Sequence, residues 1–205
     1  MTNSKPEFSE HLLIFARQPV LGQVKTRLAA AIGEAAALAV YRELLTITAA
    51  AVEAAGIPAT VWLADVPGSA TGELPEWPNT SWQLQPAGDL GHRMASAFAA
   101  AFAGGASAVA IIGTDCPGLR ATHLEQAFAL LKDHDVVLGP ATDGGYYLLA
   151  MNELQAPLFA NKEWSTATVR AATLADAAQL GLSVALLPEL ADVDTVADLR
   201  AWRGE

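Results

Sequence analysis

The sequence predicts an α/β protein of one domain, with a mixed, mostly parallel sheet and helices on both faces. Runs of strand length alternate with stretches of helical spacing over the first two-thirds of the chain, an order typical of parallel sheets. The run 107–112 is apolar almost throughout, as expected of a central strand buried on both faces. No linker, charge block or internal repeat divides the 205 residues, so we expect a single domain.

The elements of the first half follow from spacing and from turn residues. The apolar run 11–16 predicts a strand that leads into a loop containing Pro and Gly. Apolar residues three and four apart predict a helix over about 25–55 that Gly33 can interrupt, and Gly56 stands where a helix-ending glycine would. Further predicted elements are a strand at 58–64, a loop at 65–79, a strand at about 80–85 and, after the segment 88–91, a helix to about 103.

In the second half, two short strands break the alternation of strands and helices. The runs 135–139 and 145–150 lie too close together for a helix between them, which indicates a mixed sheet. Before them we expect Thr122 to cap a helix at 123–132, with Glu125 completing a capping box. After them we expect a helix at about 166–180, a strand at about 183–187 and a short helix from Thr195.

The composition restricts the partners of this chain. With 12 Lys and Arg against 22 Asp and Glu, the net charge is 12 − 22 = −10, which argues against nucleic acid or an anionic membrane surface as the main partner. The single cysteine, Cys116, excludes an intramolecular disulfide and a cysteine-based zinc site. Segment 1–10 lacks the apolar core of a signal peptide, and we interpret 97–113 as helix, turn and strand rather than a membrane span. A cytoplasmic protein is therefore expected, and its oligomeric state is open.

The loop after the first strand concentrates positive charge. Arg17, Lys25 and Arg27 are three of the 12 cations of the chain, and they stand between a strand and the start of a helix. That order is how α/β proteins build phosphate sites. Gly22 would let the backbone approach a ligand, while Lys25 and Arg27 would contact phosphate oxygens. A surface loop with solvated cations is the alternative, and the spacing is not that of a P-loop.

Asp115 stands directly after the apolar strand at 107–112. Open α/β sheets bind ligands beyond the carboxyl ends of their strands, and a carboxylate there can hold Mg²⁺ or Mn²⁺ against phosphate oxygens. A turn or helix-capping aspartate is the alternative interpretation. We interpret the adjacent Cys116 as a packing residue, because no base stands near it in the sequence.

Three later segments carry further candidates. Asp143-Gly-Gly is a turn signal between two strands, yet Asp143 could equally contact a substrate or a metal. Asp194 or Thr195 can cap the last helix, and Thr195 with Asp198 forms a capping box. That box does not need Asp192, so Asp192 could be a second metal ligand. Arg93 lies one turn into a predicted helix, where it could reach a phosphate or a sugar.

Five segments, taken in order, resemble one family. They are 15–28, 88–94, 113–117, 139–147 and 192–195. They resemble the radical-SAM/selenodomain-associated transferases, formerly a domain of unknown function, in the nucleotide-diphospho-sugar transferase superfamily. The resemblance covers nearly the whole chain. Segment 25–28 is also similar to phospholactate guanylyltransferases, and 192–195 to molybdenum-cofactor nucleotidyltransferases.

The resemblance implies a GT-A-like, Rossmann-like fold with a nucleotide on the loop after the first strand, a divalent ion on Asp115 and an acceptor over the later strands. Together with the loop cations, it implies a nucleotide site made of Phe15, Ala16, Arg17, Gly22, Lys25, Arg27, Gly91 and Arg93. Two positions depart from the family. His92 stands where many relatives have Glu, and the Asp-x-Asp of glycosyltransferases is absent at 107–112, where Asp115 stands alone.

These observations predict a Mg²⁺- or Mn²⁺-dependent transferase with a nucleotide donor. Nucleotidyl transfer from a nucleoside triphosphate to a small phosphorylated or hydroxyl acceptor is favoured, because paired cations suit a triphosphate. Lys25 would hold phosphates, Asp115 and Asp192 the metal, and Asp143 the acceptor. Glycosyl transfer from a nucleotide sugar is the main alternative, and a non-catalytic protein that binds a nucleotide or another protein is a third.

Overall fold

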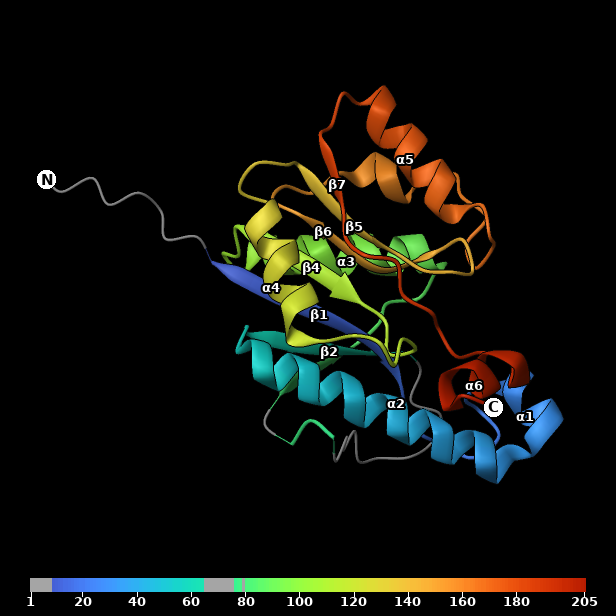
Figure 1. Ribbon diagram of the computed structural model, residues 1–205. Helices are drawn as coiled ribbons and strands as arrows, with labels where there is room; N and C mark the ends of the chain where they lie inside the picture. Colours follow the sequence, from blue (N-terminus) through green and yellow to red (C-terminus); the bar gives the residue numbers. More distant parts are fainter. Residues whose placement is uncertain (1–8, 65–75, 79) are drawn as a thin grey trace, which may run out of the picture.

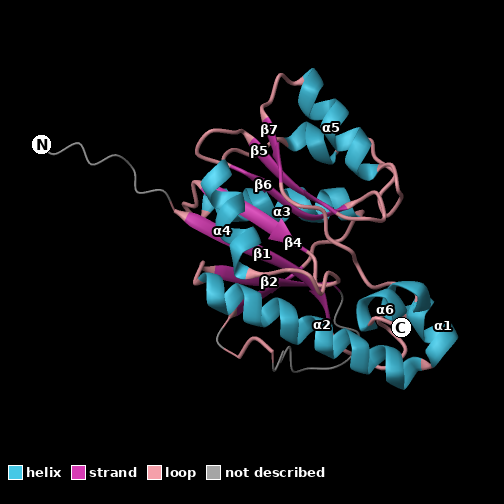
Figure 2. Ribbon diagram, in the orientation of Figure 1, coloured by secondary structure: helices cyan, strands magenta, loops and turns pink. Residues whose placement is uncertain are grey.

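The computed structural model describes residues 9–64, 76–78 and 80–205, and most of the loop predicted at 65–79 lies outside them, as does segment 1–8 (Figures 1 and 2). The strands are β1 (Glu10–Arg17), β2 (Ala59–Ala64), β3 (Ser81–Leu84), β4 (Ala108–Ile112), β5 (Val136–Pro140), β6 (Tyr146–Met151) and β7 (Val184–Leu186). The helices are α1 (Thr26–Ile32), α2 (Glu34–Ala55), α3 (Leu90–Ala103), α4 (Ala121–Leu130), α5 (Val169–Gln179), α6 (Val196–Arg203) and a 3₁₀ helix, η1 (Ala156–Phe159).

The strands form one mixed sheet in the order β3-β2-β1-β4-β6-β5-β7. Neighbours pair in parallel except at β6, which runs antiparallel to both β4 and β5. This confirms the prediction of a mixed, mostly parallel α/β sheet. Because β1 and β4 are parallel neighbours, the loops that follow them emerge at the same edge of the sheet.

Each face of the sheet is covered by helices. Leu12 and Ile14 of β1 belong to the apolar cluster that includes side chains of α2 and α4, whereas Leu13 belongs to the cluster on the opposite face with α3 and α5. This division follows from the alternation of side chains along a strand. In Figure 1, α2 and α4 lie in front of the sheet and α3 lies behind it. All five residues of β4 are buried, as the apolar run predicted.

Most of the predicted helix boundaries are confirmed. Gly33 separates α1 from α2 at a φ of 86°, and Gly56 ends α2 in the left-handed conformation, which glycine adopts without a steric penalty. The predicted cap at Thr122 is wrong. Helix α4 begins at Ala121 after Arg120, whose backbone N–H donates to His123 Nδ1 at 3.0 Å. The His123 imidazole thus occupies the position that we had assigned to the Glu125 carboxylate.

Among the described residues, α2 has the length and apolar composition of a membrane-spanning helix. In the structure, Tyr41, Leu45 and Val52 of α2 lie in the cluster that covers the sheet. A long apolar core helix passes the same compositional test, so its packing explains its sequence.

The last helix closes the fold next to the first. Thr195 Oγ1 accepts from Asp198 N at 3.3 Å and Asp198 Oδ2 accepts from Thr195 N at 2.7 Å, which confirms the predicted capping box. Val196, Leu199 and Trp202 pack against a cluster formed by α1 and α2. The segment before α6 is thereby brought to the start of α1. There Asp194 meets Lys25, which is 169 residues away in the sequence.

Candidate active site

Three distant segments meet at the carboxyl edge of the sheet. The loop after β1 ends at Lys25, the loop after β4 carries Asp115, and the segment before α6 carries Asp194. Val193 N donates to Asp115 O at 3.0 Å, which ties the third segment to the second. The site therefore depends on the placement of α6 against α1 as well as on the sheet.

Lys25 lies at the centre of this site, between two carboxylates. Its Nζ lies 2.5 Å from Asp115 Oδ1 and 2.8 Å from Asp194 Oδ1, and only 4% of its side chain is exposed. The two aspartates keep 45% and 37% of their side chains exposed. The lysine is thus enclosed, while its partners still face open space.

Opposing effects set the pKa values here. Burial of the ammonium acts to lower the pKa of Lys25, but the charges of Asp115 and Asp194 outweigh it and raise that pKa. Burial likewise raises the pKa of Asp192, and the nearby Asp143 carboxylate adds to the effect, so the value reaches about 6. Lys25 therefore stays charged at neutral pH, whereas the raised pKa of Asp192 lies close to neutral pH.

One cavity of about 660 Å³ lies beside the loop after β1. Six of the eight predicted nucleotide residues line it: Phe15, Ala16, Arg17, Lys25, Arg27 and Arg93. Asp115 and Asp194 also line it. We call it the donor cavity, after the nucleotide donor that the sequence predicts.

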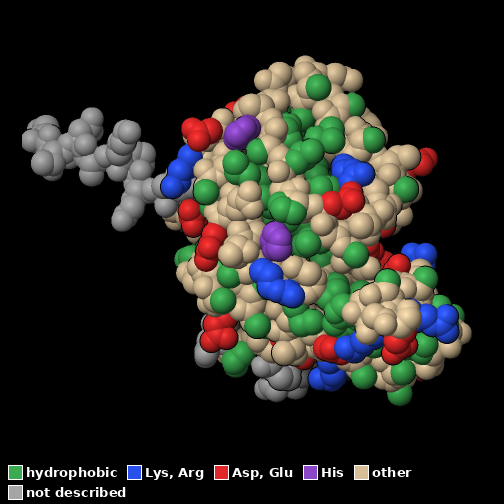
Figure 3. All heavy atoms as spheres, viewed as in Figure 1, with side chains coloured by type: hydrophobic (Ala, Val, Ile, Leu, Met, Phe, Trp, Pro, Cys, Tyr) green, Lys and Arg blue, Asp and Glu red, His purple; other side chains and the backbone are tan. Residues whose placement is uncertain are grey.

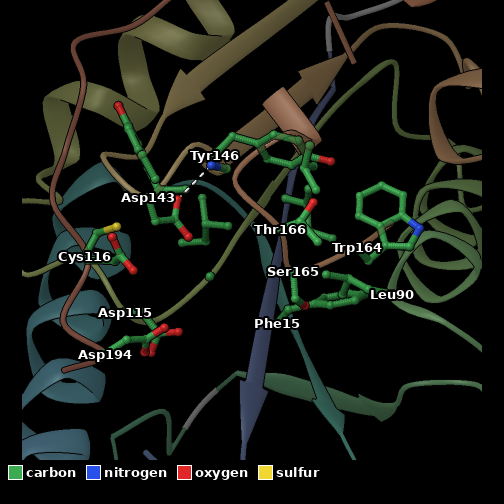
Figure 4. Close-up of a pocket in the computed structure, with 18 of the residues that line it drawn as sticks. Phe15, Leu90, Asp115, Cys116, Asp143, Tyr146, Trp164, Ser165, Thr166 and Asp194 are labelled. Atoms are coloured by element: carbon green, nitrogen blue, oxygen red, sulfur yellow. Dashed lines mark hydrogen bonds between the residues drawn. The ribbon is translucent and has the colours of Figure 1, made fainter. Parts of the chain in front are cut away.

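A second cavity, of about 490 Å³, lies over β6 and the segment before α5. Asp115, Asp194, Phe15 and Arg27 belong to both linings. Figure 4 shows its two sides, with Asp115, Asp194, Asp143 and Cys116 on one and Trp164, Leu90 and Phe15 on the other. We call it the acceptor cavity, and the two cavities meet at Asp115 and Asp194.

The predicted candidates Asp143 and Asp192 both line the acceptor cavity. Asp143 also forms the expected turn, since its Oδ1 accepts from Gly145 N at 2.7 Å. Cys116 lines the same cavity but is buried, and burial raises the pKa of its thiol well above the neutral range. A role for Cys116 in packing agrees with that environment.

Gly22 and Gly91 are not among the described residues that line either cavity. A Cβ on Gly91 would lie 2.5 Å from Phe159 O and from Trp164 Nε1, so this glycine lets α3 approach η1 and Trp164. Gly22 has a φ of 75° in the loop that carries Lys25. Their predicted contact with a nucleotide stays a prediction. Arg93, whose Nε donates to Gly88 O at 2.8 Å, faces the donor cavity.

Sequence reasoning missed Asp194. We had considered it only as an alternative cap of the last helix, and Thr195 performs that role. A signal was present, because a capping box at Thr195 and Asp198 leaves Asp194 without a local function, just as it leaves Asp192. The ion pair with Lys25 could not be read from positions 169 residues apart.

The donor set at this site fits a hard divalent cation. The carboxylates of Asp115 and Asp194 lie side by side, since an oxygen of each is within 2.8 Å of Lys25 Nζ, and both side chains keep exposed surface on which an ion can bind beside the lysine. Mg²⁺ is commonly held by one or two carboxylates and completes its shell with substrate phosphates and water. In the described part of the chain, no group of three or more His, Cys, Asp or Glu side chains is placed to hold a metal ion by itself, so such an ion would need oxygens from the ligand.

Comparison with known proteins agrees with this architecture. Residues 46–166 match the family described as "uncharacterized protein conserved in bacteria" (DUF2064). No curated protein matches the chain. A provisionally named nucleotide-diphospho-sugar transferase from Desulfovibrio desulfuricans G20 is 29% identical, with a TM-score of 0.86 over 94% of this chain and 85% of that one.

Two more distant structures share the fold. Rv0371c from Mycobacterium tuberculosis H37Rv, in complex with manganese, is 15% identical, with a TM-score of 0.59 over 96% of this chain and 98% of that one. A CMP:2-keto-3-deoxy-manno-octonic acid synthetase complexed with CTP is 14% identical, with a TM-score of 0.55 over 96% and 97%. The chain therefore has the fold of nucleotide-diphospho-sugar transferases.

Proposed function

This chain belongs to the DUF2064 family, and we propose that it is a metal-dependent transferase that uses a nucleotide donor. The favoured reaction is nucleotidyl transfer from a nucleoside triphosphate to a small acceptor. The observation that carries the proposal is the pair of cavities that meet at Asp115 and Asp194, with Lys25 between these two carboxylates. A reaction between two bound molecules needs such an arrangement, because both reactants must be held with their reacting atoms adjacent.

The charges of the donor cavity favour a polyphosphate. Arg17, Lys25, Arg27 and Arg93 line it, in a chain whose net charge is −10. Cations fixed around a phosphate chain stabilise the charge that develops as pyrophosphate leaves. A divalent ion bound by Asp115 and Asp194 would neutralise phosphate oxygens further. The proposal takes Asp194 as the partner of Asp115 in place of Asp192, whose role as a metal ligand stays a prediction from the sequence.

The proposed step transfers the nucleotidyl group from the donor to a hydroxyl group of the acceptor. An acceptor hydroxyl oxygen forms a bond to the α-phosphorus of the donor, and the bond from that phosphorus to the oxygen bridging to the β-phosphorus breaks. The hydroxyl proton passes to a carboxylate of the acceptor cavity, Asp143 or Asp192. Pyrophosphate leaves on the side of Lys25 and Arg27.

Glycosyl transfer is the second candidate, and the name of the Desulfovibrio structure favours it. In that reaction the acceptor oxygen would bond to the anomeric carbon of a nucleotide sugar, and a nucleoside diphosphate would leave. The two reactions therefore differ in their leaving group, which can be measured directly.

The test is a thermal-shift panel with Mg²⁺ or Mn²⁺ that compares nucleoside triphosphates with nucleotide sugars. A ligand that binds the native state raises the melting temperature. At a concentration of one hundred times its Kd, it adds about 2.7 kcal/mol to the free energy of unfolding. The variant is Asp115→Asn, and the control is Asp133→Asn, at an exposed position outside both cavities.

A metal-dependent shift with a triphosphate, lost in Asp115→Asn and kept in Asp133→Asn, is the expected result. A shift with nucleotide sugars alone would replace nucleotidyl by glycosyl transfer. If neither class of donor shifts the protein, the non-catalytic alternative gains and the proposed function fails.

A further inference from the structure

The two cavities differ in their balance of charge: in the described part of the chain, four cations and three carboxylates line the donor cavity, whereas one cation and four carboxylates line the acceptor cavity. Arg17, Lys25 and Arg93 line the donor cavity and not the acceptor cavity. Asp143 and Asp192 line the acceptor cavity and not the donor cavity. Within the described residues, no Lys, Arg or His belongs to the acceptor lining alone. A negatively charged group of a reactant therefore finds cations that belong to one cavity alone only in the donor cavity.

Arg27 is the one cation among the described residues of the acceptor lining, and it is shared. It is exposed and lines both cavities, so it stands where the two meet. A donor polyphosphate would engage Arg27 at that boundary. The acceptor cavity then presents the carboxylates of Asp143 and Asp192 without a further cation to pair with an acceptor phosphate, and like charges within one cavity repel.

The remaining walls of the acceptor cavity are aromatic and apolar. Tyr146, Tyr147 and Trp164 line it, together with Met94 and Val169. Figure 4 shows Trp164 and Leu90 opposite the side that carries Asp115 and Asp194. A ring-sized apolar body fits between such walls, and aromatic faces also attract cations.

We propose that the acceptor is a hydroxyl-bearing molecule with a ring-sized apolar body, uncharged or cationic, and without a phosphate or carboxylate group. This inference rests on the proposed function for the role of the cavity as acceptor site. The sequence predicts an acceptor that is either phosphorylated or a hydroxyl compound, and this inference keeps only the hydroxyl compound. The carboxylates that would repel a phosphate are suited instead to take the proton of a hydroxyl group or to hold an ammonium group.

The test uses phenolic probes of one size and different charge. Tyramine is cationic, tyrosol uncharged and 4-hydroxyphenylacetate anionic, and phenyl phosphate carries the phosphate group itself. Their Kd values are measured by isothermal titration into the full chain, with and without Mg²⁺ and the triphosphate that the thermal-shift panel selects. Ethanolamine, which lacks a ring, separates the contribution of the aromatic walls from that of charge.

We expect tyramine and tyrosol to bind at least 10-fold more tightly than phenyl phosphate and 4-hydroxyphenylacetate, and tyramine to bind more tightly than ethanolamine. In the double variant Asp143→Asn with Asp192→Asn, the ratio of the Kd values of 4-hydroxyphenylacetate and tyramine should fall to less than one-third of its wild-type value. The exposed Asp133→Asn should keep the wild-type ratio.

Binding of phenyl phosphate as tight as that of tyrosol, or no binding by any ring probe, overturns the inference. The nucleotide arm separates this failure from that of the proposed function. Stabilisation by a triphosphate together with a preference for phenyl phosphate leaves the proposed function standing and removes the acceptor class. If tyramine and tyrosol bind preferentially but no nucleotide stabilises the protein, the ligand class of this cavity stands and the proposed function fails.

Discussion

At the scale of single residues, Lys25 is the most constrained side chain of the site. Its backbone is left-handed, with φ 47° and ψ 45°, a conformation that costs a non-glycine residue roughly 1–2 kcal/mol. The two ion pairs with Asp115 and Asp194 compensate for that cost and fix the ammonium in the wall of the donor cavity. In the absence of a metal, Lys25 supplies the positive charge that these carboxylates need.

Replacement of Lys25 by methionine should therefore make the protein less stable and more responsive to Mg²⁺. Loss of one partner of a fully buried pair costs about 3–5 kcal/mol. Here we expect about 1–2 kcal/mol, because the carboxylates are 45% and 37% exposed and water screens them. Thermal melts of Lys25→Met with and without Mg²⁺ check this, and the metal should restore part of the lost stability.

Lys132→Met is the matched control, since Lys132 is exposed and lines neither cavity. It should melt within about 0.5 kcal/mol of the wild type and show the wild-type response to Mg²⁺. An equal gain from Mg²⁺ in wild type and Lys25→Met would contradict the idea that the lysine occupies the position of a cation.

His11 makes a separate prediction about pH. Its Nε2 lies 3.0 Å from Thr60 Oγ1, and burial lowers the pKa of the imidazole below its ordinary value of 6.5. The unfolded chain thus takes up a proton at a higher pH than the folded one. The stability that neutral His11 provides is fully present above pH 6.5 and is lost as the pH falls toward the folded pKa.

Between pH 8 and pH 5, wild type should lose about 0.5 kcal/mol more stability than His11→Gln, a small figure because the ring is only half-buried. Urea unfolding at the two pH values measures the difference. His92→Gln, at an exposed position, should behave as wild type, and parallel losses in all three proteins would refute the assignment to His11.

At the scale of elements, the start of α3 is positioned by close packing. Asp89 caps the helix by accepting from His92 N at 2.8 Å, and Gly91 lies against Phe159 O and the indole of Trp164. Trp164 lines the acceptor cavity, so the first turn of α3 supports one of its walls. The position of a glycine in a helix here reflects contact rather than flexibility.

Gly91→Ala should destabilise the protein even though alanine favours helices by about 1 kcal/mol. A Cβ at position 91 would lie 2.5 Å from the Phe159 carbonyl oxygen and from Trp164 Nε1, so it pushes both η1 and Trp164 away from α3. Overpacking of this kind costs about 1–3 kcal/mol. Chemical denaturation measures the net loss, which we expect to be about 1–2 kcal/mol.

Gly104→Ala provides the comparison at the other end of α3, where a Cβ would meet nothing closer than 3.2 Å. It should cost clearly less than Gly91→Ala. Equal losses in the two variants would mean that helix propensity rather than contact with Trp164 explains the glycine.

At the scale of the whole molecule, charge is distributed unevenly. The chain carries a net charge of −10, yet four cations line the donor cavity. On the face shown in Figure 3, acidic and basic side chains are interspersed and form no extended basic patch. Such a surface attracts a small polyanion at one place without attracting a long one.

We therefore expect no binding of a labelled 20-nucleotide RNA or DNA in fluorescence anisotropy at about 50 mM salt, where phosphate contacts are strongest. The triphosphate selected by thermal shift should bind under the same conditions. Submillimolar binding of the RNA that weakens steeply with salt would contradict the distribution of charge that we describe.

The sequence allowed most of the fold to be predicted, because local patterns carry it. The apolar runs of β1 and β4 and the glycines at 33 and 56 predicted the elements that the structure shows. The cap at Thr122 failed because the imidazole of His123 competes for the backbone N–H of residue 120. The 3₁₀ helix η1 was not anticipated, since four residues present too little periodicity.

By itself, the sequence determined the α/β class, the order of the strands and helices, and the loop and strand ends where Lys25, Arg27, Asp115, Asp143 and Asp192 stand. These depend on residues close together in the chain, whose spacing is visible in a single sequence. Only the tertiary structure decided that Lys25 pairs with Asp115 and Asp194, and that most of the site's cations line one cavity while Asp143 and Asp192 line the other. Those contacts join segments up to 169 residues apart, and they exist because α6 packs on α1 beside the parallel pair β1 and β4.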